Sequence, residues 1–317
     1  MSERRVTVER QTRSGTPEAA LDRLARAVGP SAQRHVPLSQ LTSMRVGGPA
    51  ELLVTVESTE ELMEAVRLAR EYDVAWRVLG GGCNVLVADT GLAGLVIINR
   101  AAGVSVEDNL VRAESGARLA KVARTCSEAG LSGMTWAEGL PGTVGGAVVG
   151  NAGAFGGDVA GSLASAAVLG PGGTVRERDD AWFDFRYRGS RLKGPDGRGF
   201  VVISAAFQVR PGDKSALKAR AEEVLAERRA RHPVGPTMGS TFKNPADGYA
   251  GRLIEEAGLK GCRVGGARVS PQHANFLVNE GGATAEDVLN LIEHVQREVE
   301  QQSGVKLALE VEMLGWQ

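Results

Sequence analysis

The sequence has few aromatic residues, few cysteines and almost no net charge. Phe, Trp and Tyr make up 4% of its 317 residues, and 38 acidic residues nearly balance 37 basic ones. A net charge of −1 argues against nucleic acid as a partner, because binding to phosphate chains is driven by clustered Lys and Arg. The cysteines, Cys83, Cys126 and Cys262, lack CxxC spacing, which argues against disulfides or structural zinc and favours a reducing, cytoplasmic location.

The sequence also lacks an uninterrupted hydrophobic run. Residues 1–15 do not contain the apolar core of a signal peptide. The longest uncharged stretch, 139–157, has the length of a membrane span but contains Pro141 and many glycines, so we expect loops there and no membrane contact. The four histidines are too scattered for metal-ligand spacing, and we expect no metal site.

Glycine is the residue in excess, with 42 copies, about twice its average usage. Two stretches are dense in it, 80–84 and 141–157. Backbone N–H groups can hold a phosphate only where no side chain blocks the approach, so such loops indicate phosphate binding. Neither stretch matches GxGxxG or GxxxxGK[ST], which leaves a Rossmann site and a P-loop unsupported. Tight turns with close packing remain the alternative.

Apolar residues recur at helical spacing in some segments and alternate in others, which predicts an α+β protein. Ser58 with Glu61 three residues later, and Thr284, mark two helix starts. The charged helix that ends before Pro233 is typical of a domain boundary. The predicted helices cover 17–28, 59 onward, 118–129, 214–231, 249–257 and 284–302. The predicted strands cover 52–56, 76–79, 95–98, 110–113, 163–169, 182–190, 200–209, 264–270, 275–279 and 305–314.

Several ordered motifs carry a resemblance to a known family. They are LTSMRVGGPAEL (41–52), RVLGGGCNVLV (77–87), GLPGTVGGAVVGNAGAFGGD (139–158), FRYRGSRLK (185–193), GSTFKNP (239–245), the stretch 250–279 and LALEVEMLG (307–315). From residue 38 onward the chain resembles the UDP-N-acetylenolpyruvoylglucosamine reductases, whose FAD-binding domain is of the vanillyl-alcohol-oxidase type. The resemblance is to the shorter type, because there is little room between Phe200 and Lys214 for the long tyrosine-bearing loop.

The resemblance implies three parts of the chain. Residues 1–35 are a leader with a short helix. An FAD-binding domain of two α/β subdomains spans 36–212, divided near residue 100, and a C-terminal α/β substrate domain spans 213–317, its last strand carrying a catalytic glutamate. The implied non-covalent FAD site comprises Gly80, Gly81, Gly82, Cys83, Asn84, Gly142, Thr143, Val144, Gly145, Gly146, Asn151 and Gly153. Cys83 stands where the family usually has Ser; a cradle of N–H groups does not need that hydroxyl.

Three residues match the family's catalytic positions. Arg188 matches the arginine that contacts the substrate carboxylate, Ser240 the proton donor, and Glu312 the catalytic glutamate of the LE-x-E motif, with Glu310 as its neighbour. On pattern alone, Arg188 would be a solvated charge, Ser240 a turn residue and Glu312 a carboxylate on an edge strand. Tyr187, Lys243, Asn244 and Asn275 are implied as substrate-site candidates.

The function that the resemblance implies is reduction of UDP-N-acetylglucosamine enolpyruvate to UDP-N-acetylmuramate, a step of peptidoglycan precursor synthesis, with NADPH as hydride donor to FAD. The substrate is a small UDP-sugar, and we expect a cytoplasmic monomer. Two rivals stay open: a flavin oxidase that uses O₂, and a silent FAD-binding or UDP-sugar-binding protein. The presence of Arg188, Ser240 and Glu312 together disfavours the second rival.

Overall fold

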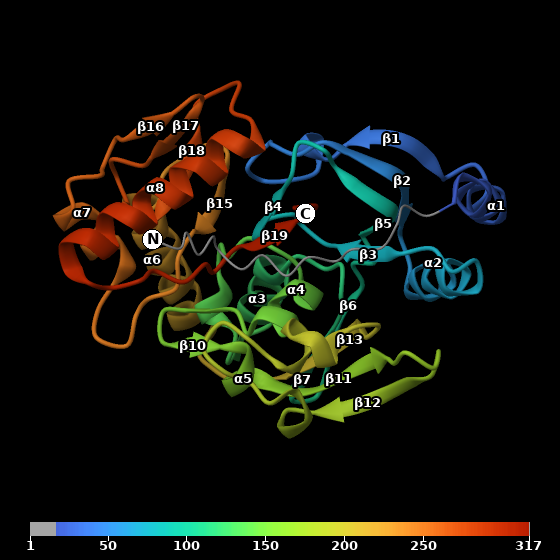
Figure 1. Cartoon of the computed structure of the whole chain (residues 1–317). Coiled ribbons are helices and arrows are strands. Elements are labelled where there is room, and N and C mark those ends of the chain that lie inside the picture. Colours follow the sequence, from blue (N-terminus) through green and yellow to red (C-terminus); the bar gives the residue numbers. More distant parts are fainter. Residues whose placement is uncertain (1–16, 317) are drawn as a thin grey trace.

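The computed structural model describes residues 17–316, which form three lobes around a common centre (Figure 1). The first lobe holds a four-stranded sheet in the order β1-β2-β5-β3, in which β2, β5 and β3 run parallel and β1 is antiparallel. Helices α1 and α2 pack on one face of this sheet. The bounds are α1 Glu18–Val28, β1 Gln33–Pro37, β2 Pro49–Val56, α2 Thr59–Glu71, β3 Trp76–Leu79 and β5 Leu92–Asn99.

The second lobe is built on an antiparallel sheet in the order β12-β11-β13-β7-β6. Helices α3 and α4 contribute to its main apolar core, together with Phe183 and Phe207. The bounds are β6 Val104–Glu107, β7 Leu110–Glu114, α3 Leu119–Glu128, α4 Val144–Gly150, α5 Val159–Ser162, β11 Leu163–Leu169, β12 Val175–Asp179 and β13 Val201–Gln208. Short strands β8 (Leu131–Ser132), β9 (Gly153–Ala154), β10 (Gly157–Asp158) and β14 (Arg210–Pro211) form two small ladders.

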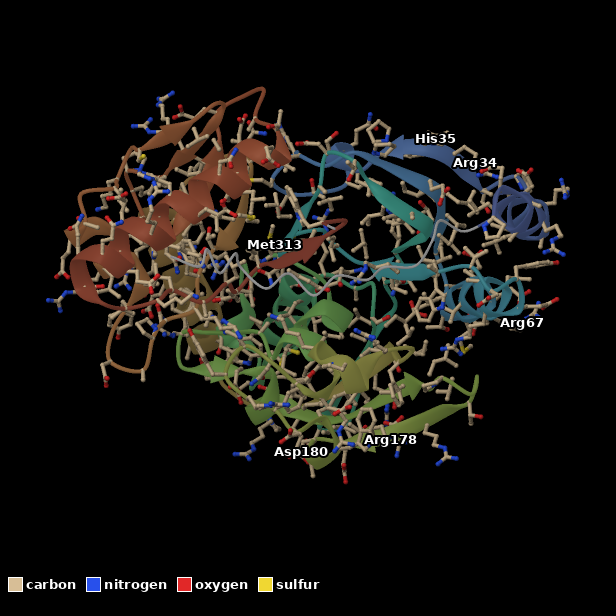
Figure 2. All side chains as sticks on the ribbon, in the orientation of Figure 1. Arg34, His35, Arg67, Arg178, Asp180 and Met313 are labelled. Carbon is tan, nitrogen blue, oxygen red and sulfur yellow. The ribbon has the colours of Figure 1, made fainter. Side chains whose placement is uncertain are left out.

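The third lobe has the sheet order β15-β18-β17-β16, covered by α7 and α8. Its elements are β15 Thr237–Ser240, α7 Ala250–Glu256, β16 Arg263–Val264, β17 Ala267–Val269, β18 Phe276–Asn279 and α8 Ala285–Ser303. Helix α6 (Lys214–Arg231) precedes this lobe in sequence but packs against α3 of the second lobe. After α8 the chain crosses back, and β19 (Glu312–Leu314) pairs in parallel with β4 (Val85–Val87). Met313 of β19 therefore lies between the lobes (Figure 2).

The expected helices and most expected strands are confirmed, including the helix start at Thr284, where the structure also shows a capping box with Asp287. The strand expected at 182–190 is wrong. Residues Ala181–Phe183 form a 3-10 turn, Asp184 and Arg188 have positive φ, and Tyr187 is 56% exposed. The alternation of aromatic residues there reflects two tight turns packed on the second core, because a positive φ interrupts an extended strand.

The two ends of the chain also differ from the expected pattern. The final strand is limited to Glu312–Leu314. Before it, Lys306, Leu307 and Ala308 alternate between exposed and buried as expected, but Glu310, expected on the exposed face, is largely buried. Of the expected leader, residues 1–16 lie outside the described part, while Leu21 and Leu24 of α1 are fully buried in the first core. Strand β1 pairs with β2, so the segment from residue 17 onward is built into the first lobe.

Candidate active site

Two glycine-rich loops face each other at the centre of the molecule. The first, 80–84, follows β3, and the second, 142–146, leads into α4. A Cβ atom on Gly80 would lie 2.1 Å from Oγ1 of Thr143, and one on Gly81 would lie 3.3 Å from Cα of Gly142. The two loops approach so closely that a side chain at Gly80 cannot be accommodated, which explains why this position is glycine.

The backbone donors of these loops are unusually free. None of the N–H groups of residues 80–84 donates a hydrogen bond to another residue of the described part, and the same holds for Gly142, Thr143 and Gly146. Five of these eight donors belong to buried or half-buried residues, namely Gly80, Gly82, Cys83, Gly142 and Thr143. Backbone donors in such positions are nearly always paired, so these five indicate that a ligand with several acceptor oxygens belongs there. The residues present therefore fit the diphosphate of FAD.

Neighbouring residues hold the first loop in shape. Gly82 has φ +60, and a Cβ there would lie 2.3 Å from the carbonyl oxygen of Leu41. Ser43 donates its N–H to the carbonyl of Gly82 at 3.0 Å and its hydroxyl to the carbonyl of Thr237 at 2.7 Å. The Sγ of Cys83 lies 3.1 Å from the carbonyl oxygen of Gly81, and burial raises the pKa of this thiol. Cys83 therefore completes the loop as a protonated, uncharged side chain.

The expected cofactor residues Asn151 and Gly153 lie at the other end of α4 from the cradle. Asn151 has φ 43, its Nδ2 donates to the carbonyl of Arg186 at 3.1 Å, and its Oδ1 accepts the N–H of Ala160 at 3.0 Å. One end of its amide holds the turn that precedes Arg188, and the other end holds the start of α5. The geometry thus links the α4 loop system to the candidate catalytic arginine.

Arg188 lies in a cluster of charged side chains between the lobes. Its Nε is 2.7 Å from Oε1 of Glu310, and the two side chains are 26% and 14% exposed. The N–H of Nε is not aimed at that oxygen, so this buried donor has no hydrogen-bond acceptor in the described part of the chain. Burial raises the pKa of Glu310, while Arg188 acts in the opposite direction. The terminal amino groups of Arg188 make no hydrogen bond within residues 17–316.

Glu312, the expected catalytic glutamate, has a different partner. Its Oε1 lies 2.8 Å from Nη1 of Arg77, and its side chain is 45% exposed. Lys193 lies between these groups, with Nζ 3.3 Å from the carbonyl of Arg188 and 3.4 Å from that of Glu310. Burial lowers the pKa of this lysine, with Lys243 adding to the effect. Sequence reasoning did not select Lys193 or Arg77, although Lys193 ends the FRYRGSRLK motif and that motif was a usable signal.

Ser240 ends β15, whose pairing with β18 is irregular between Thr237 and Ser240, a stretch in which Gly239 has φ +78. The next residues are tied to the last segment of the chain, because Lys243 donates its N–H to the carbonyl of Ala308 and Glu310 donates its N–H to the carbonyl of Thr241. These bonds bring the Ser240 segment alongside the segment that carries Glu310 and Glu312.

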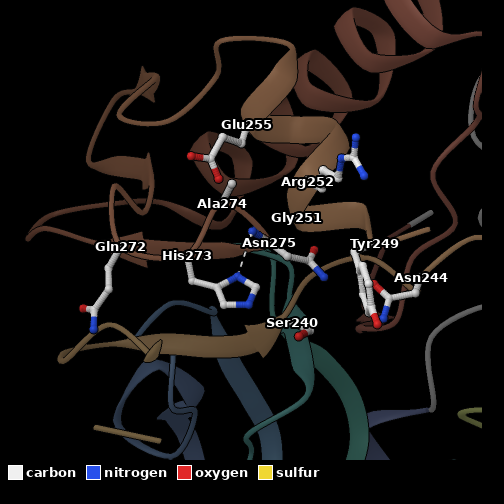
Figure 3. A pocket seen from close by; sticks show the side chains of 10 residues that line it. All are labelled: Ser240, Asn244, Tyr249, Gly251, Arg252, Glu255, Gln272, His273, Ala274 and Asn275. Atoms are coloured by element: carbon white, nitrogen blue, oxygen red, sulfur yellow. Dashed lines mark hydrogen bonds between the residues drawn. The ribbon is translucent and has the colours of Figure 1, made fainter. Parts of the chain in front are cut away.

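A pocket of about 320 Å³ opens beside Ser240. Figure 3 shows Ser240 at the lower centre of the view, with His273 on one side and Tyr249 and Asn244 on the other. Asn244 accepts the N–H of Ala250 at 3.0 Å and thereby caps α7. His273, which sequence reasoning had set aside with the other histidines, lines this pocket, and burial lowers its pKa.

Asn275 has a structural task in the same pocket. Its Oδ1 accepts the N–H of Phe242 at 2.9 Å, its Nδ2 donates to the carbonyl of Phe242 at 2.8 Å, and its own carbonyl accepts the N–H of Thr241. The buried amide therefore clamps the backbone just after Ser240. Of the expected substrate residues, Asn244 and Asn275 lie together in the pocket, and Lys243 lies near Lys193. Tyr187 is exposed, and the centre of its ring lies 5.4 Å from Cζ of Arg188.

No group of three or more His, Cys, Asp and Glu side chains in residues 17–316 is placed to hold a metal ion. In the same part of the chain, the helices are too short or too polar for any of them to traverse a lipid bilayer.

The loops and the fold define the class of protein. Residues 50–178 match the family model of an FAD-binding domain, the part that carries the donor-lined cradle, and the chain is a flavin-dependent oxidoreductase. Residues 230–314 match the model of the UDP-N-acetylenolpyruvoylglucosamine reductase C-terminal domain. The chain belongs to the UDP-N-acetylenolpyruvoylglucosamine reductase family.

Whole-length relatives support this assignment. UDP-N-acetylenolpyruvoylglucosamine reductase 2 of Symbiobacterium thermophilum is 44% identical over 89% of this chain and 92% of its own length. The enzyme of Lactobacillus delbrueckii subsp. bulgaricus is 40% identical over 92% of this chain and 97% of its own. Among solved structures, the reductase of Thermus caldophilus superposes with a TM-score of 0.76 at 37% identity, covering 89% of this chain and 98% of that one.

Proposed function

We propose that this chain uses NADPH and FAD to reduce the enolpyruvyl ether of a UDP-N-acetylglucosamine derivative to UDP-N-acetylmuramate. The observation that carries the proposal is Arg188, a half-buried guanidinium with free terminal amino groups, paired with Glu310, whose backbone N–H bonds to the carbonyl of Thr241 next to Ser240. A planar fork of donors suits a carboxylate, and the enolpyruvyl group is a carboxylate attached to a vinyl ether.

FAD, when bound, supplies the hydride chemistry, accepting hydride from NADPH and passing it to the substrate. The residues that would hold its diphosphate are the N–H groups of 80–84 and of Gly142, Thr143 and Gly146. Gly80 and Gly82 keep this space open, because a Cβ at either position would collide with neighbouring atoms.

Arg188 orients the substrate by holding its carboxylate with the terminal amino groups. Glu310 lies at Nε, on another edge of the guanidinium, and compensates the half-buried charge while the substrate is absent. As hydride adds to the vinyl carbon, negative charge grows on the adjoining carbon and on the carboxylate. Arg188 stabilises that charge, and Lys193 adds a second cation nearby.

Ser240 delivers the proton to the carbon that carries this charge. A serine hydroxyl is a weak acid and donates only to a strongly basic centre, which is the condition that hydride addition creates. Its hydroxyl makes no hydrogen bond with any other residue in 17–316, so the donor is uncommitted before the substrate binds. Glu312, held by Arg77, acts with Arg188 at the substrate carboxylate.

The pocket beside Ser240 is the candidate site for the rest of the UDP-sugar, with Asn244 and His273 in its wall. Lys243 and Tyr187 flank the charged cluster and are further substrate-site candidates. We propose that the enzyme acts as a cytoplasmic monomer, which size-exclusion chromatography with light scattering tests.

The experiment is anaerobic mixing of the purified, FAD-loaded protein. Addition of NADPH should bleach the flavin absorbance, and later addition of the enolpyruvyl substrate should restore it in proportion to the UDP-N-acetylmuramate formed. A flavin oxidase would leave its flavin yellow with NADPH and would turn over with O₂ instead. Protein that cannot be reconstituted with FAD would contradict the proposal as a whole.

A further inference from the structure

One basic side chain beside the cradle has no role so far. Arg118 and Thr143 form an antiparallel β-bridge, flanked by hydrogen bonds from Leu119 N–H to the Gly142 carbonyl at 3.1 Å and from Val144 N–H to the Ala117 carbonyl at 2.9 Å. These two bonds fix the backbone of Arg118 against the second glycine loop, next to the free N–H of Thr143.

The bridge also determines the side-chain direction. In an antiparallel pair, residues directly opposite each other carry their side chains on the same face. The Thr143 side chain faces the first loop, since a Cβ on Gly80 would lie 2.1 Å from its Oγ1. The Arg118 side chain therefore leaves the backbone on the face where the two loops meet. Its positive charge reaches this face: burial raises the pKa of Cys83 in the first loop, and the charge of Arg118 acts in the opposite direction.

Arg118 is also unpaired. Its side chain is exposed, and no carboxylate or other acceptor in residues 17–316 forms an ion pair or hydrogen bond with it. By contrast, Arg112, a few residues before it, is paired with Glu107 at 3.2 Å. An unpaired guanidinium beside eight free N–H donors makes the cradle positive as well as donor-rich.

We propose that Arg118 binds the diphosphate of FAD and supplies the cradle with its charged side chain. The inference rests on the proposed function only in requiring that FAD occupies the cradle. The N–H groups would set the position of the phosphate oxygens, and Arg118 would add affinity that depends on ionic strength.

The test is the dissociation constant of FAD, measured with FAD-free protein by quenching of flavin fluorescence at low and at high salt. Arg118→Ala should raise this constant about tenfold at low salt, and the difference should shrink to about twofold or less at high salt. Arg118→Lys should recover most of the affinity. The matched control is Lys121→Ala, which removes the same charge from an exposed position one turn further along α3 and should leave the constant unchanged.

Three results separate the possibilities. An Arg118→Ala constant within twofold of wild type at low salt overturns the assignment of Arg118 and leaves the proposed function standing. A loss that is equally large at high salt, or that Lys121→Ala reproduces, also overturns it, because a direct charge contact must be local and screened. Failure of the wild-type protein to bind FAD refutes the proposed function itself. Arg118→Gln, measured in parallel, keeps the test valid where alanine impairs folding.

Discussion

Replacing Ser240 with alanine isolates the proton transfer from the rest of the reaction. The Ser240 hydroxyl makes no hydrogen bond with the residues the structure describes, so the change removes no internal hydrogen bond, and the free energy of unfolding should stay within about 0.5 kcal/mol of wild type. A general acid typically contributes 10²–10⁴ in rate, which corresponds to about 3–5 kcal/mol of barrier. Only the transfer to the enolpyruvyl substrate needs this proton.

The assay is anaerobic stopped-flow spectroscopy of the two half-reactions. Flavin bleaching by NADPH should keep its wild-type rate in Ser240→Ala, while reoxidation by the enolpyruvyl substrate should slow by about 10²–10⁴. Thr241→Val is the matched control. The Thr241 hydroxyl is fully buried without a hydrogen-bond partner, so its removal should change neither half-reaction. Reoxidation of Ser240→Ala at the wild-type rate would refute the proton-donor role.

Three further predictions concern stability. Asn275→Ala removes both amide bonds to the buried backbone of Phe242 and should lower the free energy of unfolding by about 2–4 kcal/mol in urea titrations, whereas a loss below 1 kcal/mol would contradict the clamp. Asp89 accepts the N–H groups of Ala285 and Glu286 at the start of α8, so Asp89→Ala should cost about 1–2 kcal/mol by thermal unfolding, and Asp89→Asn less; equal losses in the two variants would contradict the cap. Burial lowers the pKa of His232 to about 4, so the unfolded chain binds the proton first as pH falls from about 6.5 to 4. Stability should therefore decrease with acidification over that range, and His232→Phe should flatten the decrease; an unchanged slope would exclude His232 as its source.

Local signals predicted much of the fold. Helix α8 begins after Thr284, where the threonine accepts the N–H of Asp287 and Asp287 returns the bond, so a four-residue pattern determines a helix start. At the start of α2, Ser58 likewise accepts the N–H of Glu61, whereas the Glu61 side chain accepts the N–H of Glu57 and not that of Ser58. The glycine density of 80–84 was also a usable signal for the candidate cradle, because a Cβ at Gly80 or Gly82 would collide with neighbouring atoms.

The charged cluster could not be predicted in the same way. Arg188 is paired with Glu310 across 122 positions of sequence, and Arg77 with Glu312 across 235, so both ion pairs depend on the crossing of the chain from the third lobe to the first. The turns around Arg188 were also hidden, since its positive φ carries no glycine signal in a segment whose aromatic residues alternate as in a strand. The spacing of the LE-x-E motif does not show that Glu310 pairs with Arg188 and Glu312 with Arg77.

The parallel pairing of β19 with β4 has a consequence for biosynthesis. Strand β4 follows the first glycine loop directly, yet its partner is made about 225 residues later. At roughly 5–20 residues per second, a ribosome takes about 11–45 s to produce β19 after β4 has emerged. Throughout that interval the edge of β4 lacks its native neighbour, and a chain that stops short of Glu312 cannot complete this ladder. The ladder beside the candidate cradle can therefore form only after β19 has been translated.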